Sequence, residues 1–191
     1  MAGETKNDGG WKKLEAEQVA DCRVFSVERQ HFERLANGKS ADFFVIRPTN
    51  WAVAMGRVPD GRWLVIRQFR FGRNEFGWEF PSGCAEAGED PIEAATREFR
   101  EETGYAGKDP VLLGNMAPNP AMQDNTCGFV FFRSIELFGA PEWDEHEEIE
   151  SCLWEDSELR AAIRDGRMSH ALMLTALYLY DAWAEEETTG A

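Results

Sequence analysis

Residues 83–105, "GCAEAGEDPIEAATREFREETGY", contain good helix signals from Asp90 to Gly104. Asp90 suits the N-cap of a helix, Pro91 suits its first position, and Gly104 can end it. Apolar residues recur on one side of this segment, where they would pack inward. The stretch therefore predicts one amphipathic helix in the middle of the chain.

The predicted helix places three glutamates, Glu98, Glu101 and Glu102, within five positions. At about 100° per residue they share one arc of the helix surface, where like charges repel by a few tenths of a kcal/mol per pair. An acidic face that simply meets solvent is the plain alternative. Magnesium, however, binds through a few carboxylates together with substrate phosphates. We therefore interpret the arc as a metal site that faces solvent.

The loop before the helix supports this interpretation. Gly83 has no Cβ, so the backbone can be approached closely there. Glu89 and Arg97 lie eight positions apart, and an ion pair between them would fix the path of the loop.

Length, composition and charge restrict the remaining possibilities. The 191 residues suit one domain with at most a small appendage, and 43% hydrophobic residues are enough for a sizeable core. A net charge of −15 disfavours nucleic acid and anionic membranes as partners, because an acidic surface repels phosphates. With no membrane-span run, no apolar signal region and four widely spaced cysteines, we expect a reduced cytoplasmic protein.

Extended segments precede the helix. Residues 1–10 predict a flexible tail, and residues 22–32 and 41–48 flank an Asn-Gly turn that predicts a β-hairpin. Residues 51–58 and 63–70 flank the turn "PDGR" and predict a second pair of strands.

Two helices are predicted at the end of the chain, at about residues 157–164 and 169–184. Strands first, one helix in the middle and helices at the end indicate an α+β domain.

The segment from Gly83 to Tyr105 resembles the Nudix box, G-x5-E-x7-R-E-U-x-E-E-x-G-U, where U is apolar or aromatic. The matching positions are Gly83, Glu89, Arg97, Glu98, Phe99, Glu101, Glu102, Gly104 and Tyr105. The resemblance implies a Nudix fold, in which a mixed β-sheet is sandwiched between helices. It also implies hydrolysis of a nucleoside diphosphate linked to another moiety.

The same resemblance implies two or three Mg²⁺ ions, or Mn²⁺ in their place. Glu98 and Glu102 would be metal ligands, and the Ser82 carbonyl a further contact. Glu101 would be a ligand or a catalytic group that orients water. Structural support would come from Gly83, Glu89 and Arg97.

Residues 65–83, "VIRQFRFGRNEFGWEFPSG", resemble the strand–loop–strand of ADP-ribose and nucleoside-diphosphate-sugar pyrophosphatases. In that branch both Arg70 and Glu79 would belong to the substrate site, Arg70 holding phosphate and Glu79 lying near the metals. The alternative for Arg70 is an ordinary surface arginine at a strand end.

Residues 144–150, "DEHEEIE", resemble the acidic loop of the same branch. Glu145 would be the general base and Glu147 an added metal ligand, whereas His146 is expected to point to solvent. A solvated loop without catalytic residues is the alternative.

Residues 117–129, "APNPAMQDNTCGF", depart from the branch because they lack its Pro-Gly turn. Asn119 and Gln123 would contact the sugar, or they are ordinary turn residues. The departure leaves both ADP-ribose and another nucleotide sugar, such as GDP-mannose, open as the substrate.

The resemblance divides the chain into residues 1–48, a tail with an N-terminal antiparallel β-element, and residues 49–191, the Nudix hydrolase domain. It implies a homodimer that exchanges the N-terminal element and releases a nucleoside monophosphate and a sugar 1-phosphate. Two alternatives stay open. One is a housecleaning hydrolase of nucleoside triphosphates or dinucleoside polyphosphates, and the other is a catalytically silent module that senses a nucleotide.

Overall fold

The computed structural model describes residues 10–145 and 147–190, so most of the predicted tail and His146 lie outside the described residues. The chain forms two compact units. The first runs up to Thr49 and includes Ala117–Asn125, and the second comprises Asn50–Met116 and Thr126 to the C-terminus.

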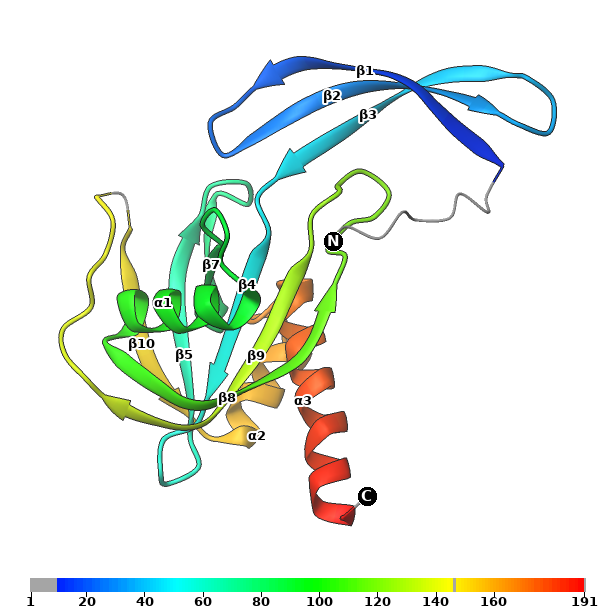
Figure 1. The fold of residues 1–191 in the computed structure, drawn as a ribbon. Helices are drawn as coiled ribbons and strands as arrows, with labels where there is room; N and C mark the ends of the chain where they lie inside the picture. Colours follow the sequence, from blue (N-terminus) through cyan, green and yellow to red (C-terminus); the bar gives the residue numbers. More distant parts are fainter. Residues whose placement is uncertain (1–9, 146, 191) are drawn as a thin grey trace. The chain divides into compact units, whose positions relative to one another are not determined.

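The first unit contains a three-stranded antiparallel sheet in the order β1-β2-β3 (Figure 1). Its strands are β1 (Trp11–Asp21), β2 (Phe25–Arg34) and β3 (Ser40–Pro48). The β2–β3 hairpin confirms the predicted one, and it turns through Gly38 at a φ of 68°. The sequence did not predict β1, because its "WKKLEAEQVAD" is exposed nearly throughout and lacks an alternating apolar face.

The second unit contains two sheets, with the orders β10-β5-β6 and β7-β4-β9-β8. Their strands are β4 (Trp51–Gly56), β5 (Trp63–Arg70), β6 (Glu75–Glu79), β7 (Ser82–Cys84), β8 (Tyr105–Met116), β9 (Cys127–Leu137) and β10 (Ile149–Trp154). The β4–β9 pair is parallel and the other ladders of this unit are antiparallel, so the sheet around β4 is mixed.

The predicted pairing of residues 51–58 with residues 63–70 was wrong. Within the described residues, β4 and β5 form no ladder with each other, and an isolated bridge joins Arg57 to Trp63 beside their turn. A turn sets the reversal of the chain but does not choose the partner of a strand. Both strands are largely buried, and each takes two neighbours in a different sheet.

The helices are α1 (Pro91–Thr103), α2 (Asp156–Arg164) and α3 (Ala171–Thr189). The capping predicted for α1 is confirmed. Asp90 accepts hydrogen bonds from the N–H groups of Ile92 and Glu93, and Gly104 ends the helix at a φ of 72°. Within the described part of the chain, no helix is long and apolar enough to cross a membrane.

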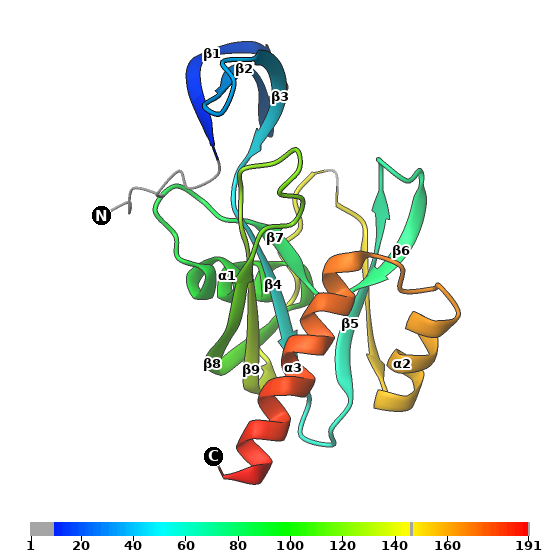
Figure 2. The same ribbon diagram turned by 90° about the vertical axis from the view of Figure 1, so that its right-hand side faces the viewer.

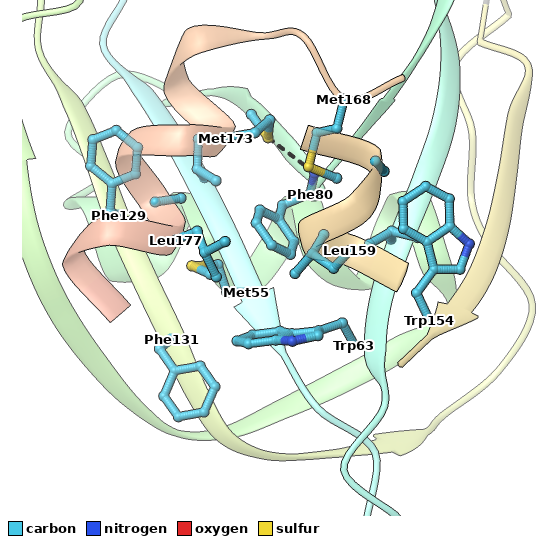
Figure 3. Packing of buried hydrophobic residues seen from close by; sticks show 14 of the residues in the cluster. Met55, Trp63, Phe80, Phe129, Phe131, Trp154, Leu159, Met168, Met173 and Leu177 are labelled. Atoms are coloured by element: carbon cyan, nitrogen blue, oxygen red, sulfur yellow. Dashed lines mark hydrogen bonds between the residues drawn. The ribbon is translucent and has the colours of Figure 1, made fainter. Parts of the chain in front are cut away.

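The mixed sheet lies between α1 and α3 (Figures 1 and 2). Alternate residues of β4 face opposite sides, so Ala52 and Ala54 pack with α1 whereas Val53 and Met55 pack toward α3. Figure 3 shows the α3 side, where Met55 lies among Phe80, Phe129 and Leu177. There the N–H of Phe80 donates to Sδ of Met173 at 3.0 Å. On the opposite face, Ala52 and Ala54 pack with Phe99 of α1.

Candidate active site

The packing of α1 sets the direction of its glutamates. Ala94, Ala95 and Phe99 are fully buried against the sheet, and the carboxylates lie beside this apolar side. We predicted that these carboxylates face solvent, and for Glu102 this prediction was wrong. Glu102 is only 2% exposed, because its arc of the helix borders the strand β7 rather than open water.

Gly83 lies directly against one of these carboxylates. A Cβ added at Gly83 would collide with the carboxylate of Glu98. The close approach predicted for this glycine is therefore present, and the group that approaches is a side chain of the box helix itself.

Arg97 connects the loop before α1 to the glutamates. Its Nε and Nη2 donate to the two oxygens of Glu89, each at 2.9 Å, so the predicted pair is formed. Nη1 donates to Glu98 at 2.8 Å and to Glu101 at 3.1 Å, and Nη2 also donates to the carbonyl of Cys84 at 2.8 Å. The hydrogen bonds from Arg97, together with one from the backbone of the loop, hold the pKa of Glu89 at about 2.

Glu102 has the least solvated carboxylate of the group. Its Oε2 accepts a hydrogen bond of 2.9 Å from the backbone N–H of Ser82. Burial raises its pKa well above the usual range, and the negative charges of Glu98 and Glu147 act in the same direction. Burial likewise raises the pKa of Glu98, in spite of the bond from Arg97. These raised pKa values indicate that the nearby positive charge does not offset the burial of Glu98 and Glu102.

The donor chemistry of these residues fits Mg²⁺, which prefers carboxylate oxygens. A cationic nitrogen of Arg97 already lies against Glu98 and Glu101, at a place that a metal ion would compete for. Within residues 10–145 and 147–190, however, no three Asp, Glu, His or Cys side chains converge as a ready metal site. Metal binding would thus require these two carboxylates to exchange Arg97 for the ion.

The side chains of Arg70 and Glu79 meet across the β5–β6 hairpin, although the backbone of Arg70 lies opposite Glu75 and that of Glu79 opposite Ile66. Nε of Arg70 donates to Oε1 of Glu79 at 2.9 Å, and Nη2 donates to Oε2 at 2.7 Å. The Glu79 side chain is only 3% exposed. Burial would raise its pKa, but hydrogen bonds from His170 and Arg70 lower it to about 2. The positive charge of Arg70 also acts on the pKa of Glu102, so this pair belongs to the surroundings of the box.

The acidic loop after β9 is attached to the C-terminal end of α1. The N–H of Glu142 donates to the carbonyl of Glu101 at 2.8 Å, and Nε1 of Trp143 donates to the carbonyl of Glu102 at 2.9 Å. Glu147 is half-buried, and its charge raises the pKa of Glu102. Glu145 is exposed. The structure therefore brings Glu147 near Glu102 and leaves Glu145 exposed to solvent.

Asn119 and Gln123 lie in the first unit, in the segment Ala117–Asn125. The carbonyl of Asn119 accepts hydrogen bonds from the N–H groups of Met122 and Gln123, which is a turn, and Gln123 forms a β-bridge with Ile46. Their role as sugar contacts stays a prediction.

Two residues of the site were missed from the sequence. Nδ1 of His170 lies 3.2 Å from Oε2 of Glu79, and Trp143 holds the acidic loop. Their partners are 91 and 41 positions away, so no local spacing marks either of them.

Two hollows of the second unit meet at Arg70 and His170. One reaches the start of the box at Ser82, Gly83 and Cys84, and the other extends along the β5–β6 hairpin. A ligand in the first hollow would lie against both the box and Arg70.

Comparison with known proteins assigns these features to one family. A model of the NUDIX domain matches residues 48–173. The chain is similar to ADP compounds hydrolase NudE of Escherichia coli (strain K12), at 28% identity over 171 residues, covering 89% of this chain and 91% of that protein. It is also similar to ADP-ribose pyrophosphatase of Bacillus subtilis (strain 168), at 26% identity over 140 residues, covering 73% and 75%.

One more relative and one solved structure are also similar to this chain. ADP-sugar pyrophosphatase of Mus musculus is 39% identical over 128 residues, covering 65% of this chain and 56% of that protein. A crystal structure of an ADP compounds hydrolase superimposes with a TM-score of 0.82 at 26% identity, covering 96% of this chain and 98% of the other. The likeness extends over almost the whole length of the chain.

Proposed function

Because this chain belongs to the Nudix family and is a Nudix hydrolase, we propose that it cleaves the diphosphate of an ADP-linked compound, such as ADP-ribose or another ADP-sugar, with Mg²⁺. The observation that carries the proposal is the closeness of two kinds of group. Arg70, which can bind phosphate, lines the same hollow as Ser82, and the N–H of Ser82 donates to the buried Glu102 at 2.9 Å. A diphosphate with a bound cation needs both.

Arg70 and the glutamates have different roles in binding. A diphosphate carries two negative charges that repel an incoming nucleophile. Arg70 would offset part of this charge, with Glu79 fixing its guanidinium from behind. Mg²⁺ would be held by Glu98, Glu102 and Glu147, with the Ser82 carbonyl as a further contact. When bound, the ion supplies positive charge to the diphosphate oxygens and acidifies water.

The acidic loop would supply the base. Glu145 accepts a proton from the attacking water, and Glu101 orients that water. The water oxygen forms a bond to one phosphorus while the bond from that phosphorus to the bridging oxygen breaks. AMP and the phosphorylated remainder of the substrate leave. The attachment of the loop to α1 through Glu142 and Trp143 supports this assignment, because it joins Glu145 to the box helix.

The choice of adenine over guanine is supported by the relatives. Three of them are named for ADP compounds, ADP-ribose and ADP-sugars. The missing Pro-Gly turn after residue 116 had left GDP-mannose equally open. We therefore place ADP-ribose and ADP-glucose ahead of GDP-mannose in the order of expected turnover.

A panel of nucleotides tests the proposal. ADP-ribose, ADP-glucose, GDP-mannose, ATP and diadenosine tetraphosphate are incubated with Mg²⁺, and the products are separated by chromatography. We expect AMP from the ADP-sugars, with kcat/KM at least about tenfold above that for GDP-mannose. Reaction in ¹⁸O-labelled water identifies the phosphorus that is attacked.

Each other result has a definite meaning. Preference for GDP-mannose contradicts the adenine assignment, and cleavage of ATP or the dinucleotide alone supports a housecleaning hydrolase. Tight binding of ADP-ribose without products at saturating Mg²⁺ supports a sensing module.

A further inference from the structure

His170 contacts the substrate site from a part of the chain that the box does not include. It precedes α3, and its Nδ1 lies 3.2 Å from Oε2 of Glu79. The same Glu79 oxygen accepts the 2.7 Å hydrogen bond from Nη2 of Arg70. One nearly buried carboxylate therefore joins an imidazole to a guanidinium.

The acceptor determines which ring nitrogen carries hydrogen. Glu79 is ionised, because its pKa is about 2, and an ionised carboxylate can only accept. Nδ1 of His170 must therefore carry the hydrogen of this contact. The rest of the ring lines both hollows that meet at Arg70.

The position of His170 on α3 does not explain the choice of residue. Helix N-caps favour Ser, Thr, Asp and Asn, whose side chains accept from the first free N–H groups. His170 occupies the N-cap position, yet its side chain makes no capping hydrogen bond. The His170 side chain therefore contacts Glu79 and does not cap the helix.

Arg70 has donors left over after it binds Glu79. Nε and one hydrogen of Nη2 are used by the carboxylate, and within the described part of the chain Nη1 has no protein acceptor. The Arg70 side chain is 36% exposed and lines both hollows. Its free edge is thus directed away from Glu79, and the angle of that edge depends on how firmly Glu79 is held.

We propose that His170 is a positioning residue for the diphosphate: by donating from Nδ1 to Glu79, it fixes the carboxylate that orients Arg70. This inference rests on the proposed function, in which Arg70 contacts the substrate diphosphate. With His170 removed, Glu79 keeps its bonds to Arg70 but loses its attachment to α3. Arg70 and Glu79 then rotate together, and the free edge of Arg70 no longer has one fixed direction.

Three variants test the role of His170. His170→Leu removes the donor, His170→Asn keeps an N–H group near the place of Nδ1, and Ser169→Ala is the control at the neighbouring residue of the same hollow. With ADP-ribose and Mg²⁺, His170→Leu should raise KM about tenfold and leave kcat within about twofold, because Arg70 binds the ground state and the transition state alike. His170→Asn should restore most of the affinity, and Ser169→Ala should match the wild type.

A second measurement needs neither substrate nor metal. In ¹⁵N-labelled protein the Nε–H resonance of Arg70, assigned by its loss in Arg70→Lys, reports the bond to Glu79. We expect slow exchange with water in the wild type and in His170→Asn, and clearly faster exchange in His170→Leu. Thermal unfolding of the same samples separates this local change from a general loss of stability.

The two measurements distinguish the possible failures. An unchanged Arg70 resonance in His170→Leu overturns the positioning role, whatever the turnover. A changed resonance in a protein that cleaves no ADP-sugar supports the contact between the residues and overturns the proposed substrate. A changed resonance with unchanged KM in an active enzyme overturns the role of His170 in substrate binding.

Discussion

At the scale of single residues, the site is a set of carboxylates that differ in their surroundings. Glu89 is paired with Arg97, Glu79 is buried but held by two donors, and Glu102 is buried with one backbone donor. Pairing lowers the pKa of the first two, whereas burial raises that of Glu102. Glu102 is therefore the carboxylate of this group that a bound cation would stabilise most.

Glu102→Gln should lower kcat about 10²-fold or more, because it removes one charge from the proposed metal site. The fold should survive, and without metal the variant should unfold at the same temperature or slightly higher. A neutral amide costs less to bury than a carboxylate, and it can still accept from the N–H of Ser82. Turnover at saturating Mg²⁺ and calorimetry in a chelator check the two parts. Near-normal turnover would contradict the assignment.

Glu79→Gln tests the stability that comes from a lowered pKa. The folded pKa of about 2 lies below the usual 4.5, so the contribution of Glu79 is present above pH 4.5 and is lost as the pH falls toward 2. At pH 7 the variant should be less stable by about 3 kcal/mol at most. The difference from the wild type should shrink between pH 4.5 and pH 2.

Urea unfolding at pH 7, 4.5 and 3 measures this difference. Glu75→Gln is the matched control on the same hairpin, because its ion pair with Arg73 is exposed on both sides. Such pairs contribute little, so the control should change stability by less than about 1 kcal/mol at every pH. A constant difference for Glu79→Gln across this range would be incompatible with a lowered pKa.

At the scale of elements, the important contact is that between α1 and the loop that follows β9. The last carbonyls of a helix have no partner within it. Here the carbonyls of Glu101 and Glu102 accept from Glu142 and Trp143 of the loop. Gly104, at the C-terminal end of α1, is also close to Gly139, so that a Cβ there would collide with the Gly139 carbonyl. The helix end and the loop therefore hold each other in place.

Trp143→Phe keeps an aromatic ring and removes the donor to Glu102. We expect kcat for ADP-ribose to fall about tenfold with KM nearly unchanged, because the loop that carries Glu145 is less firmly held. Glu145→Gln, which removes the proposed base itself, should lower kcat about 10²-fold. The loss of kcat in Trp143→Phe is compared with this value. Hydrogen exchange of the backbone at residues 142–148 should become faster in Trp143→Phe. If neither variant differs from the wild type, the loop has no part in the chemistry.

At the scale of the whole molecule, the first unit exposes aromatic side chains that are not fully covered by packing within its own sheet. The ring of Phe43 packs edge-on against both Trp11 and Phe32. Even so, Phe43 is 45% exposed and Phe44 is 59% exposed. A surface of this kind is typical of a protein–protein interface.

We expect a homodimer in which residues 1–48 form the shared interface, with more than about 2,000 Å² buried in total. Phe44→Glu should shift the equilibrium toward monomer, because it places a charge in the apolar contact. Leu137→Glu, a substitution of a more exposed residue in the second unit, is the control and should stay dimeric. Light scattering at micromolar concentration measures both, and a monomeric wild type would rule the dimer out.

The parts of this protein that could be predicted are those in which neighbouring residues interact. The start and end of α1 depend on Asp90 and Gly104, which act within one helical turn, and the β2–β3 hairpin depends on its own short turn. The box motif likewise placed its carboxylates on one helix face.

Contacts between distant parts of the chain could not be predicted in the same way. The separate sheets of β4 and β5, the burial of Glu102 behind β7, and the contacts of His170 and Trp143 all join residues many positions apart. A strand has two edges and can take many partners, and a carboxylate has no fixed pKa until its neighbours are packed around it. The local sequence therefore identified the chemical groups of the site, whereas packing set their charge, their burial and their partners.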